Sequence, residues 1–153
     1  MVVRTFLPSV KIVKKPLSKG IPLNPQTLGD HIRKVRIERG LLQKSVADTI
    51  GVCEDALTFW ENNRSQPQIH HCPAIIDFLQ YYPFSHDPST ISGKLKQIRH
   101  YRGLTYQSLG NLLGVNASTA RQWEMNNTIT KRSHFFAVIT LWVQLRYYPQ
   151  YLS

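Results

Sequence analysis

The sequence predicts an all-α protein built from two tandem copies of one small helical unit. Residues 28–79 align with residues 91–142 at an offset of 63, and 13 of the 52 aligned positions are identical. Average residue usage would give about three identities by chance, so the repeat decides the fold class. In both copies apolar residues recur at helical spacing, and a Gly-Val pair interrupts that spacing at the same aligned position. We therefore expect two domains of four to five short helices each.

Length indicates the size of the domains, and charge indicates the kind of binding partner. The repeat divides the 153 residues into two units of about 55 residues, a size at which folding alone is marginal. The net charge of +10 points to nucleic acid or an anionic membrane surface. That excess is uneven, at +5 in residues 1–26, −1 in residues 27–83 and +6 in residues 84–153. The N-terminal arm and the second copy carry the charge that would attract a polyanion.

Cysteine content and hydropathy bear on the compartment. Cys53 and Cys72 are too few for a disulfide framework. Prolines and lysines interrupt the N-terminal segment before any apolar core of signal-peptide length forms. The most apolar stretch, residues 135–145, is too short to span a bilayer. These observations predict a cytoplasmic protein with no membrane partner.

The first copy is expected at residues 27–80, after a basic, flexible arm at residues 1–26. Thr27 has the character of an N-cap, and Asp30 three residues on would complete a capping box. Gly40 is expected to end the first helix. The later helices of this copy are expected at residues 43–50, 54–62 and 73–80.

The second copy, residues 90–146, follows the same plan. Its helices are expected at residues 91–102, 106–113, 117–125 and 133–146. A linker at residues 81–89 joins the copies, and a tail at residues 147–153 follows. The aromatic residues of the linker predict that it packs and fixes one copy relative to the other. Lys94, near the start of the second copy, is expected to be exposed.

The second and third helices of each copy have the anatomy of a helix-turn-helix. Gly51 and Gly114 supply the sharp turn, where a residue with a Cβ atom would resist a positive φ. Val52 and Val115 follow and are expected to plug the core below the turn. Other inward positions are the small residues Ala47 and Gly110 and the third-helix residues Leu57, Trp60, Ala120 and Trp123.

These motifs support a family resemblance. The first copy reads LLQKSVA over residues 41–47, then Gly51-Val52, then WENNRSQP over residues 60–67. This combination resembles the Cro and lambda-repressor-like family, also called XRE, and residues 117–119 with residues 123–126 resemble it again. In that family the third helix reads bases in the major groove. The resemblance implies two tandem lambda-repressor-like domains that bind duplex DNA.

The resemblance also implies roles for particular residues. An Arg late in the first helix pairs with the Glu that ends the third, which implies structural ion pairs at Arg36–Glu61 and Arg99–Glu124. The family contacts a phosphate through a Gln at the start of the second helix, which is Gln43 in the first copy and is replaced by Tyr106 in the second. Tyr106 and the adjacent Gln107 can both donate to phosphate.

The two copies differ as candidate DNA readers. The remaining candidate contacts of the first copy are Thr58, Phe59 and Arg64, but its reading helix opens with Glu54 and Asp55, which oppose a phosphate surface. Phe59 suits either a thymine methyl or another protein, and both readings stay open. The second copy offers a small, polar face of Asn116, Ala117, Ser118, Thr119, Arg121 and Gln122, with Lys131 and Arg132 placed for the backbone. We therefore expect the second copy to be the reader; the alternative is an ordinary solvated helix face.

Other patterns suggest no chemistry. Cys53, His70, His71 and Cys72 lack paired ligand spacing, so we expect no metal site. No catalytic arrangement or phosphate-binding glycine loop stands out, so we expect no cofactor and no enzyme activity. The aromatic residues of the linker and tail are expected to pack the copies together or to form a homodimer or partner surface.

The sequence thus predicts a nucleoid-associated regulator of transcription that binds duplex DNA sequence-specifically. A rival from another class is a protein-interaction module, such as an antitoxin or phage-type adaptor, in which one copy is degenerate and Phe59 holds a partner. An RNA-binding or bridging factor is a third possibility that the basic arm permits.

Overall fold

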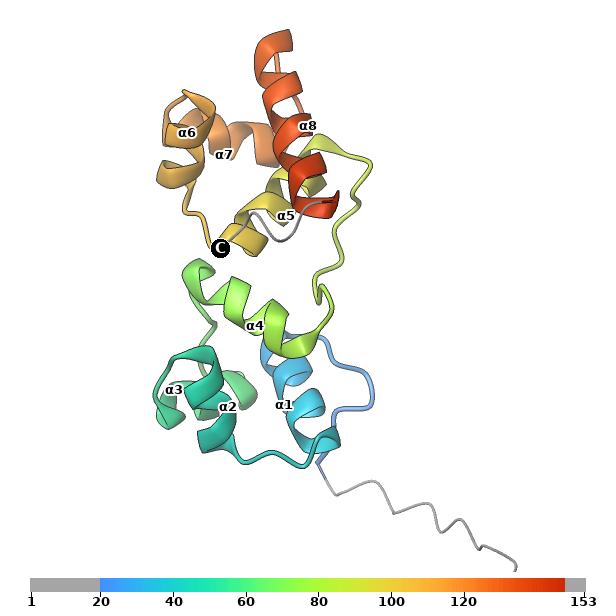
Figure 1. The fold of residues 1–153 in the computed structure, drawn as a ribbon, viewed down its shortest axis with the longest axis vertical. Helices are drawn as coiled ribbons and strands as arrows, with labels where there is room; N and C mark the ends of the chain where they lie inside the picture. The colour runs from blue at the N-terminus through green and yellow to red at the C-terminus, as the bar shows by residue number, and fades with distance from the viewer. Residues whose placement is uncertain (1–19, 148–153) are drawn as a thin grey trace, which may run out of the picture.

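A computed structural model describes residues 20–147 of the chain, so the expectations for residues 1–19 and 148–153 lie outside the described residues. The described part contains eight α-helices and one short 3₁₀ helix, and no strand occurs in it (Figure 1). The prediction of an all-α fold is confirmed.

The first unit begins with a capped helix. The Thr27 side chain accepts from the Asp30 backbone N–H at 3.0 Å, and the Asp30 carboxylate accepts from the Thr27 backbone N–H at 3.1 Å. This is the predicted capping box, which pairs two donors that every helix start leaves unpaired. The helices of this unit are α1 (Leu28–Glu38), α2 (Gln43–Ile50), α3 (Glu54–Glu61), the 3₁₀ helix η1 (Ile69–His71) and α4 (Cys72–Leu79).

The second unit has the same order of four α-helices, and residues 127–131 hold no counterpart of η1. Three of its helices begin with a side-chain cap, provided by Thr90, Thr105 and Asn116. Its helices are α5 (Ile91–Arg102), α6 (Tyr106–Leu113), α7 (Ala117–Asn126) and α8 (Arg132–Tyr147). The main difference in length is at the end, because α8 has 16 residues and α4 has 8.

Each unit encloses its own hydrophobic core. The first cluster contains Ile32, Leu57 and Ile75, each fully buried, together with Trp60. The second contains Leu95, Ile98 and Leu109, together with Trp123 at the position aligned with Trp60. Leu57, Trp60, Ala120 and Trp123 all point inward, as the spacing predicts.

The turn between the second and third helices is built as expected. Gly51 and Gly114 adopt left-handed φ angles of 80° and 68°. A Cβ atom on Gly110 would lie 2.6 Å from the Val115 carbonyl oxygen, so α6 and the start of α7 approach too closely for any larger residue. Val52 and Val115 are half-buried against their cores. The turn therefore fixes the third helix against the second in both units.

One exposure prediction is wrong. Lys94 is only 9% exposed, and its Nζ donates to the carbonyl oxygens of Pro88 at 2.6 Å and Ser89 at 2.8 Å. The ammonium also lies 5.0 Å from the centre of the Trp142 ring. Lys94 is covered because the first turn of α5 lies against the end of the linker and against α8. The spacing of apolar residues along a single helix does not reveal such contacts with other elements.

Candidate nucleic-acid interface

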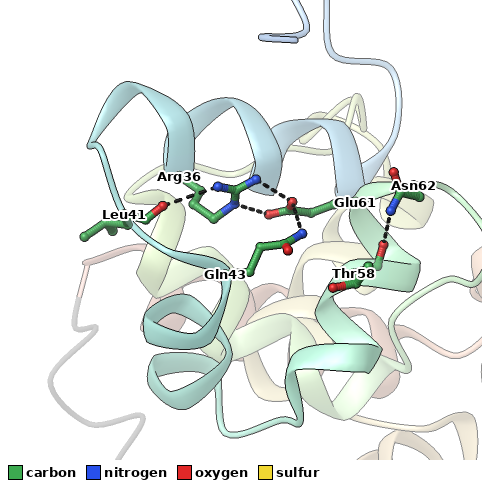
Figure 2. A network of polar contacts seen from close by, with 6 residues as sticks. All are labelled: Arg36, Leu41, Gln43, Thr58, Glu61 and Asn62. Carbon is green, nitrogen blue, oxygen red and sulfur yellow. Dashed lines mark hydrogen bonds and ion pairs between the residues drawn. The ribbon is translucent and has the colours of Figure 1, made fainter. Parts of the chain in front are cut away.

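In the first unit, a buried ion pair braces α3 against α1. Arg36 donates from Nε to Glu61 Oε1 at 2.6 Å and from Nη2 to Glu61 Oε2 at 2.7 Å (Figure 2). Arg36 also donates to the Leu41 carbonyl oxygen at 3.3 Å, and Gln43 Nε2 donates to Glu61 Oε2 at 2.9 Å. Glu61 is only 3% exposed, so these donors replace the water that its carboxylate has lost.

In the second unit, different contacts form the same brace. Arg99 Nη1 donates to both carboxylate oxygens of Glu124, at 2.9 and 3.0 Å, and Arg99 Nε donates to the Leu104 carbonyl oxygen at 3.1 Å. Tyr106 donates its hydroxyl proton to Glu124 Oε1 at 2.8 Å, and the Arg99 guanidinium lies 3.7 Å from the centre of the Tyr106 ring. Burial and this hydrogen bond raise the pKa of Tyr106. The ion pairs expected from the resemblance are therefore present in both units.

This network changes what can be expected of Gln43 and Tyr106. The amide of Gln43 has two protons, and the bond to Glu61 uses one of them. Tyr106 has a single hydroxyl proton, which Glu124 accepts, so it cannot donate to a phosphate while that bond is made. The neighbouring Gln107 is exposed and donates to Asn111 Oδ1 at 3.1 Å. Of the two aligned residues, only Gln43 keeps a free donor.

The outer face of α7 presents unpaired donors. Arg121 and Gln122 are exposed, and within the described residues neither makes a hydrogen bond or an ion pair. Trp123 and Glu124, the next residues along the helix, are buried. The brace thus holds α7 from behind while its two longest polar side chains stay free in front.

The start of α7 uses some of the other candidate residues internally. Asn116 Oδ1 accepts from the Thr119 backbone N–H and from the Ser118 hydroxyl, both at 2.8 Å. Ala117 and Thr119 are half-buried. Asn116 therefore serves first as a helix cap and Ser118 as a donor to it, and of these two side chains only the Asn116 amide N–H₂ stays available as a donor.

The corresponding face of α3 is acidic and apolar. Glu54 and Asp55 are exposed, Thr58 is half-buried and Phe59 is 45% exposed. The Thr58 carbonyl oxygen accepts from Asn62 Nδ2 at 2.8 Å (Figure 2). A hollow of about 530 Å³ lies between α1, α2 and α3, lined by Arg33, Arg36, Leu42, Gln43, Lys44, Glu54, Glu61 and Asn62. This hollow is thus lined by three cations, Arg33, Arg36 and Lys44, and by two acids, Glu54 at the start of α3 and Glu61 at its end.

The residues expected to contact the sugar-phosphate backbone of DNA are exposed in both units. Arg64 follows α3, and Lys131 and Arg132 lie at the start of α8. The Arg132 guanidinium lies 5.8 Å from the centre of the Phe136 ring, on the exposed side of α8. All three side chains are available to a ligand.

Both units contain a His–Trp contact that the sequence analysis did not predict. His71 packs on Trp60 with ring centres 5.3 Å apart, and His134 packs on Trp123 at 5.2 Å. Burial and the neighbouring His70 lower the pKa of His71. His71 and His134 are identical at the 63-residue offset, so the alignment itself contained the signal.

Two negative findings apply to residues 20–147. No three His, Cys, Asp or Glu side chains come together there in a way that could hold a metal ion. None of the helices in that range is long and apolar enough to cross a membrane.

Comparison with known proteins identifies part of this architecture. Residues 32–85 match the family model HTH_3, described as Helix-turn-helix. This match supports an XRE-like helix-turn-helix in this part of the chain, a kind of domain found in DNA-binding transcription regulators. The match ends in the linker, before the second unit. No curated protein and no solved structure matches the chain.

Proposed function

We propose that this protein binds duplex DNA sequence-specifically through the major groove and regulates transcription, with α7 as the main base-reading helix. The observation that carries the proposal is the pair Arg121 and Gln122, exposed and unpaired on a helix that is braced from behind. Arg and Gln are the side chains shaped for paired hydrogen bonds to guanine and adenine edges. Free donors on a rigid helix can make such bonds without first breaking contacts inside the protein.

The proposal includes a second helix-turn-helix domain in residues 90–146. Its support is the aligned identities, the same helix order, the left-handed Gly114 between α6 and α7, and the aligned ion pair. Trp123 and Glu124 occupy the same inward positions as Trp60 and Glu61. This similarity of the interior supports a domain of the same kind beyond the part that the family model matches.

Charge supports the division of roles between the units. Residues 84–153 carry +6 and residues 27–83 carry −1. Lys131 and Arg132 beside α7 provide phosphate contacts, and in the first unit Gln43, with its remaining amide proton, and Arg64 do the same. In this arrangement the second unit reads bases and the first unit adds backbone contacts.

Selection of bound sites from random duplex DNA tests the function. The expected result is a recurring motif for the full chain, which changes or disappears when Arg121 and Gln122 are both replaced by alanine. The matched control is the pair Thr58→Ala and Phe59→Ala, at the aligned positions of α3, which should leave the motif recognisable. Recovery of no motif by the full chain, with weak binding to any duplex, would contradict sequence-specific binding.

One observation favours a second candidate function. Phe59 is a large apolar side chain, 45% exposed, and it lies about one turn of α3 after the exposed acid Asp55. Such a surface suits a basic protein partner better than a phosphate backbone. In this candidate function α3 holds a protein, and the selection experiment would give no motif that depends on Arg121.

A further inference from the structure

The two units meet at a junction built from contacts that have no counterpart inside either unit. Gly103, which ends α5, adopts a left-handed φ of 63°. A Cβ atom there would lie 3.0 Å from the His70 Cα in η1 and 3.3 Å from the Pro73 side chain. The aligned Gly40 has a φ of 68°, yet nothing lies within 4 Å of its Cβ position. Gly103 therefore has a role that the aligned Gly40 lacks, because it allows the second unit to contact the first unit closely.

Two successive tyrosines of the linker contact different units. The Tyr81 hydroxyl lies 2.8 Å from His31 Nδ1 in α1, and the Tyr82 hydroxyl lies 2.8 Å from His100 Nδ1 in α5. Tyr82 also stacks on Tyr101 with ring centres 5.3 Å apart, and Phe84 packs on His100 at 4.0 Å. The linker is thus anchored at its start to the first unit and immediately afterwards to the second.

The end of the linker is anchored as well. Lys94 donates to the carbonyl oxygens of Pro88 and Ser89, as described above. A Cβ atom on Gly93 would lie 1.8 Å from the Asp87 carbonyl oxygen, so the linker backbone lies directly against α5. In this arrangement no long free segment of linker separates the units.

The helix-turn-helix elements of the two units lie on the same side of the molecule in this view. In Figure 1, α2 and α3 of the first unit and α6 and α7 of the second all lie to the left of the long axis. Successive major grooves face one side of a duplex only once per turn, about every 34 Å. Two units held at a fixed separation can therefore both contact the duplex only when their two sites are a matching distance apart along the helical repeat.

We propose that Gly103 and Tyr82 are specificity-determining residues that fix the separation and phase at which the two units contact one duplex. This inference rests on the proposed function, because it assigns DNA contacts to both units. In this proposal the length of the linker does not decide which DNA phosphates the first unit contacts. The junction decides it, because it fixes the position of the first unit relative to the bases that α7 reads. Rigid presentation raises affinity because less freedom is lost on binding.

The first arm of the test needs no DNA. Spin labels are attached at Asp48→Cys and Asn111→Cys, exposed positions that align with each other, in a background with Cys53→Ser. Cys72 is buried and its pKa is raised to about 11 by burial, so it should resist labelling. We expect one narrow distance distribution, which broadens or shifts in Gly103→Ala and in Tyr82→Ala and stays unchanged in the matched control Gly40→Ala.

The second arm is a hydroxyl-radical footprint on the site selected by the full chain. We expect two protected regions at one separation, with the region of the first unit weakened or spread in Tyr82→Ala while the region of α7 persists. The variants at Gly103 and Tyr82 act independently, so failure of one to fold leaves the other as the test.

The outcomes separate this inference from the proposed function. A broad distance distribution in the unaltered junction, a footprint that Tyr82→Ala leaves identical, or a single protected region would overturn the inference while sequence-specific binding stands. Absence of any selected site would overturn both, even if the distance distribution is narrow.

Discussion

The two units share their interiors and differ at their surfaces. Each has a buried Trp, a buried Glu and an Arg from the first helix that pairs with that Glu. The outer faces of α3 and α7 have diverged, with acids and Phe59 on one and Arg121 and Gln122 on the other. One scaffold can therefore hold the third helix of each unit in the same way while the two helices present different side chains.

A second contrast lies at the last helix of each unit. Arg39 donates from Nη1 to the Phe78 carbonyl oxygen at 2.6 Å and from Nη2 to the Leu79 carbonyl oxygen at 3.4 Å, where α4 ends. The aligned Arg102 has a buried Nε with no hydrogen-bond partner in the described part of the chain, and the last helix of its unit, α8, continues beyond the aligned position to Tyr147. Extension of the helix removes the free carbonyl groups that an arginine can cap.

The largest expected effect concerns the shared interior. Arg99→Ala leaves Glu124 buried without its ionic partner, which costs about 3–5 kcal/mol of unfolding free energy when burial is complete. Arg36→Ala should cost a similar amount in the first unit. Denaturant unfolding measures both, with the exposed Lys44→Ala as the control. If Arg99→Ala unfolds no more easily than Lys44→Ala, the brace does not stabilise the second unit.

The junction predicts a pH dependence. Burial, and to a lesser extent the positive charges of His86, Arg99 and Lys96, lower the pKa of His100 from 6.5 to about 4. The folded state therefore binds this proton less readily than the unfolded state, so stability is full above pH 6.5 and is lost as the pH falls toward 4. The loss is at most about 3–4 kcal/mol, at roughly 1.4 kcal/mol per pKa unit.

Thermal melts at pH 7 and pH 4.5 measure this loss. The variant His100→Phe keeps an aromatic ring beside Phe84 but has no proton to gain, so its melting temperature should fall less between the two pH values. Equal falls in the two proteins would show that His100 does not carry the dependence.

The contrast between the last helices predicts a smaller effect. Arg39→Ala should lower the unfolding free energy by about 1 kcal/mol, because a charge-assisted cap of α4 is lost. Arg102→Ala should cost less, because the aligned arginine caps no helix end. Chemical denaturation of the two variants in parallel makes the comparison, and a larger loss for Arg102→Ala would reverse it.

The smallest expected effect separates the arm from the two units. Removal of residues 1–20 deletes a charge of +5. The slope of log affinity against log salt should become less steep by about 0.9 for each phosphate that the arm neutralises, and the preferred site should be unchanged. An identical slope in the shortened protein would mean that the arm does not bind DNA.

Local signals made much of the fold predictable. The capping box at Thr27, the left-handed glycines and the 3.6-residue spacing specify helix limits within the chain itself, and most predicted boundaries lie within one residue of those in the structure. The ion pairs depended on the family resemblance, because their partners are 25 residues apart in sequence.

Sequence reasoning did not anticipate three side-chain contacts, one of which makes the expected exposure of Lys94 wrong. Lys94 is covered by the linker and by Trp142, and Tyr106 is drawn inward by Glu124. Asn116 is a candidate for base contact by its position, but its side-chain oxygen is used by the helix cap. In each case a polar side chain that looks available in one helix has a partner that the helical spacing does not reveal.

The proposed function depends on base reading by α7 and not by α3. The most direct measurement is a titration of Arg121→Ala, Gln122→Ala and the aligned Thr58→Ala and Phe59→Ala against one selected site and one scrambled site. We expect each α7 variant to lose about 1–3 kcal/mol of binding free energy on the selected site and much less on the scrambled one, with smaller losses for the α3 variants. Loss of specific binding in Phe59→Ala, with no change in Arg121→Ala, would show that α3 and not α7 reads the bases.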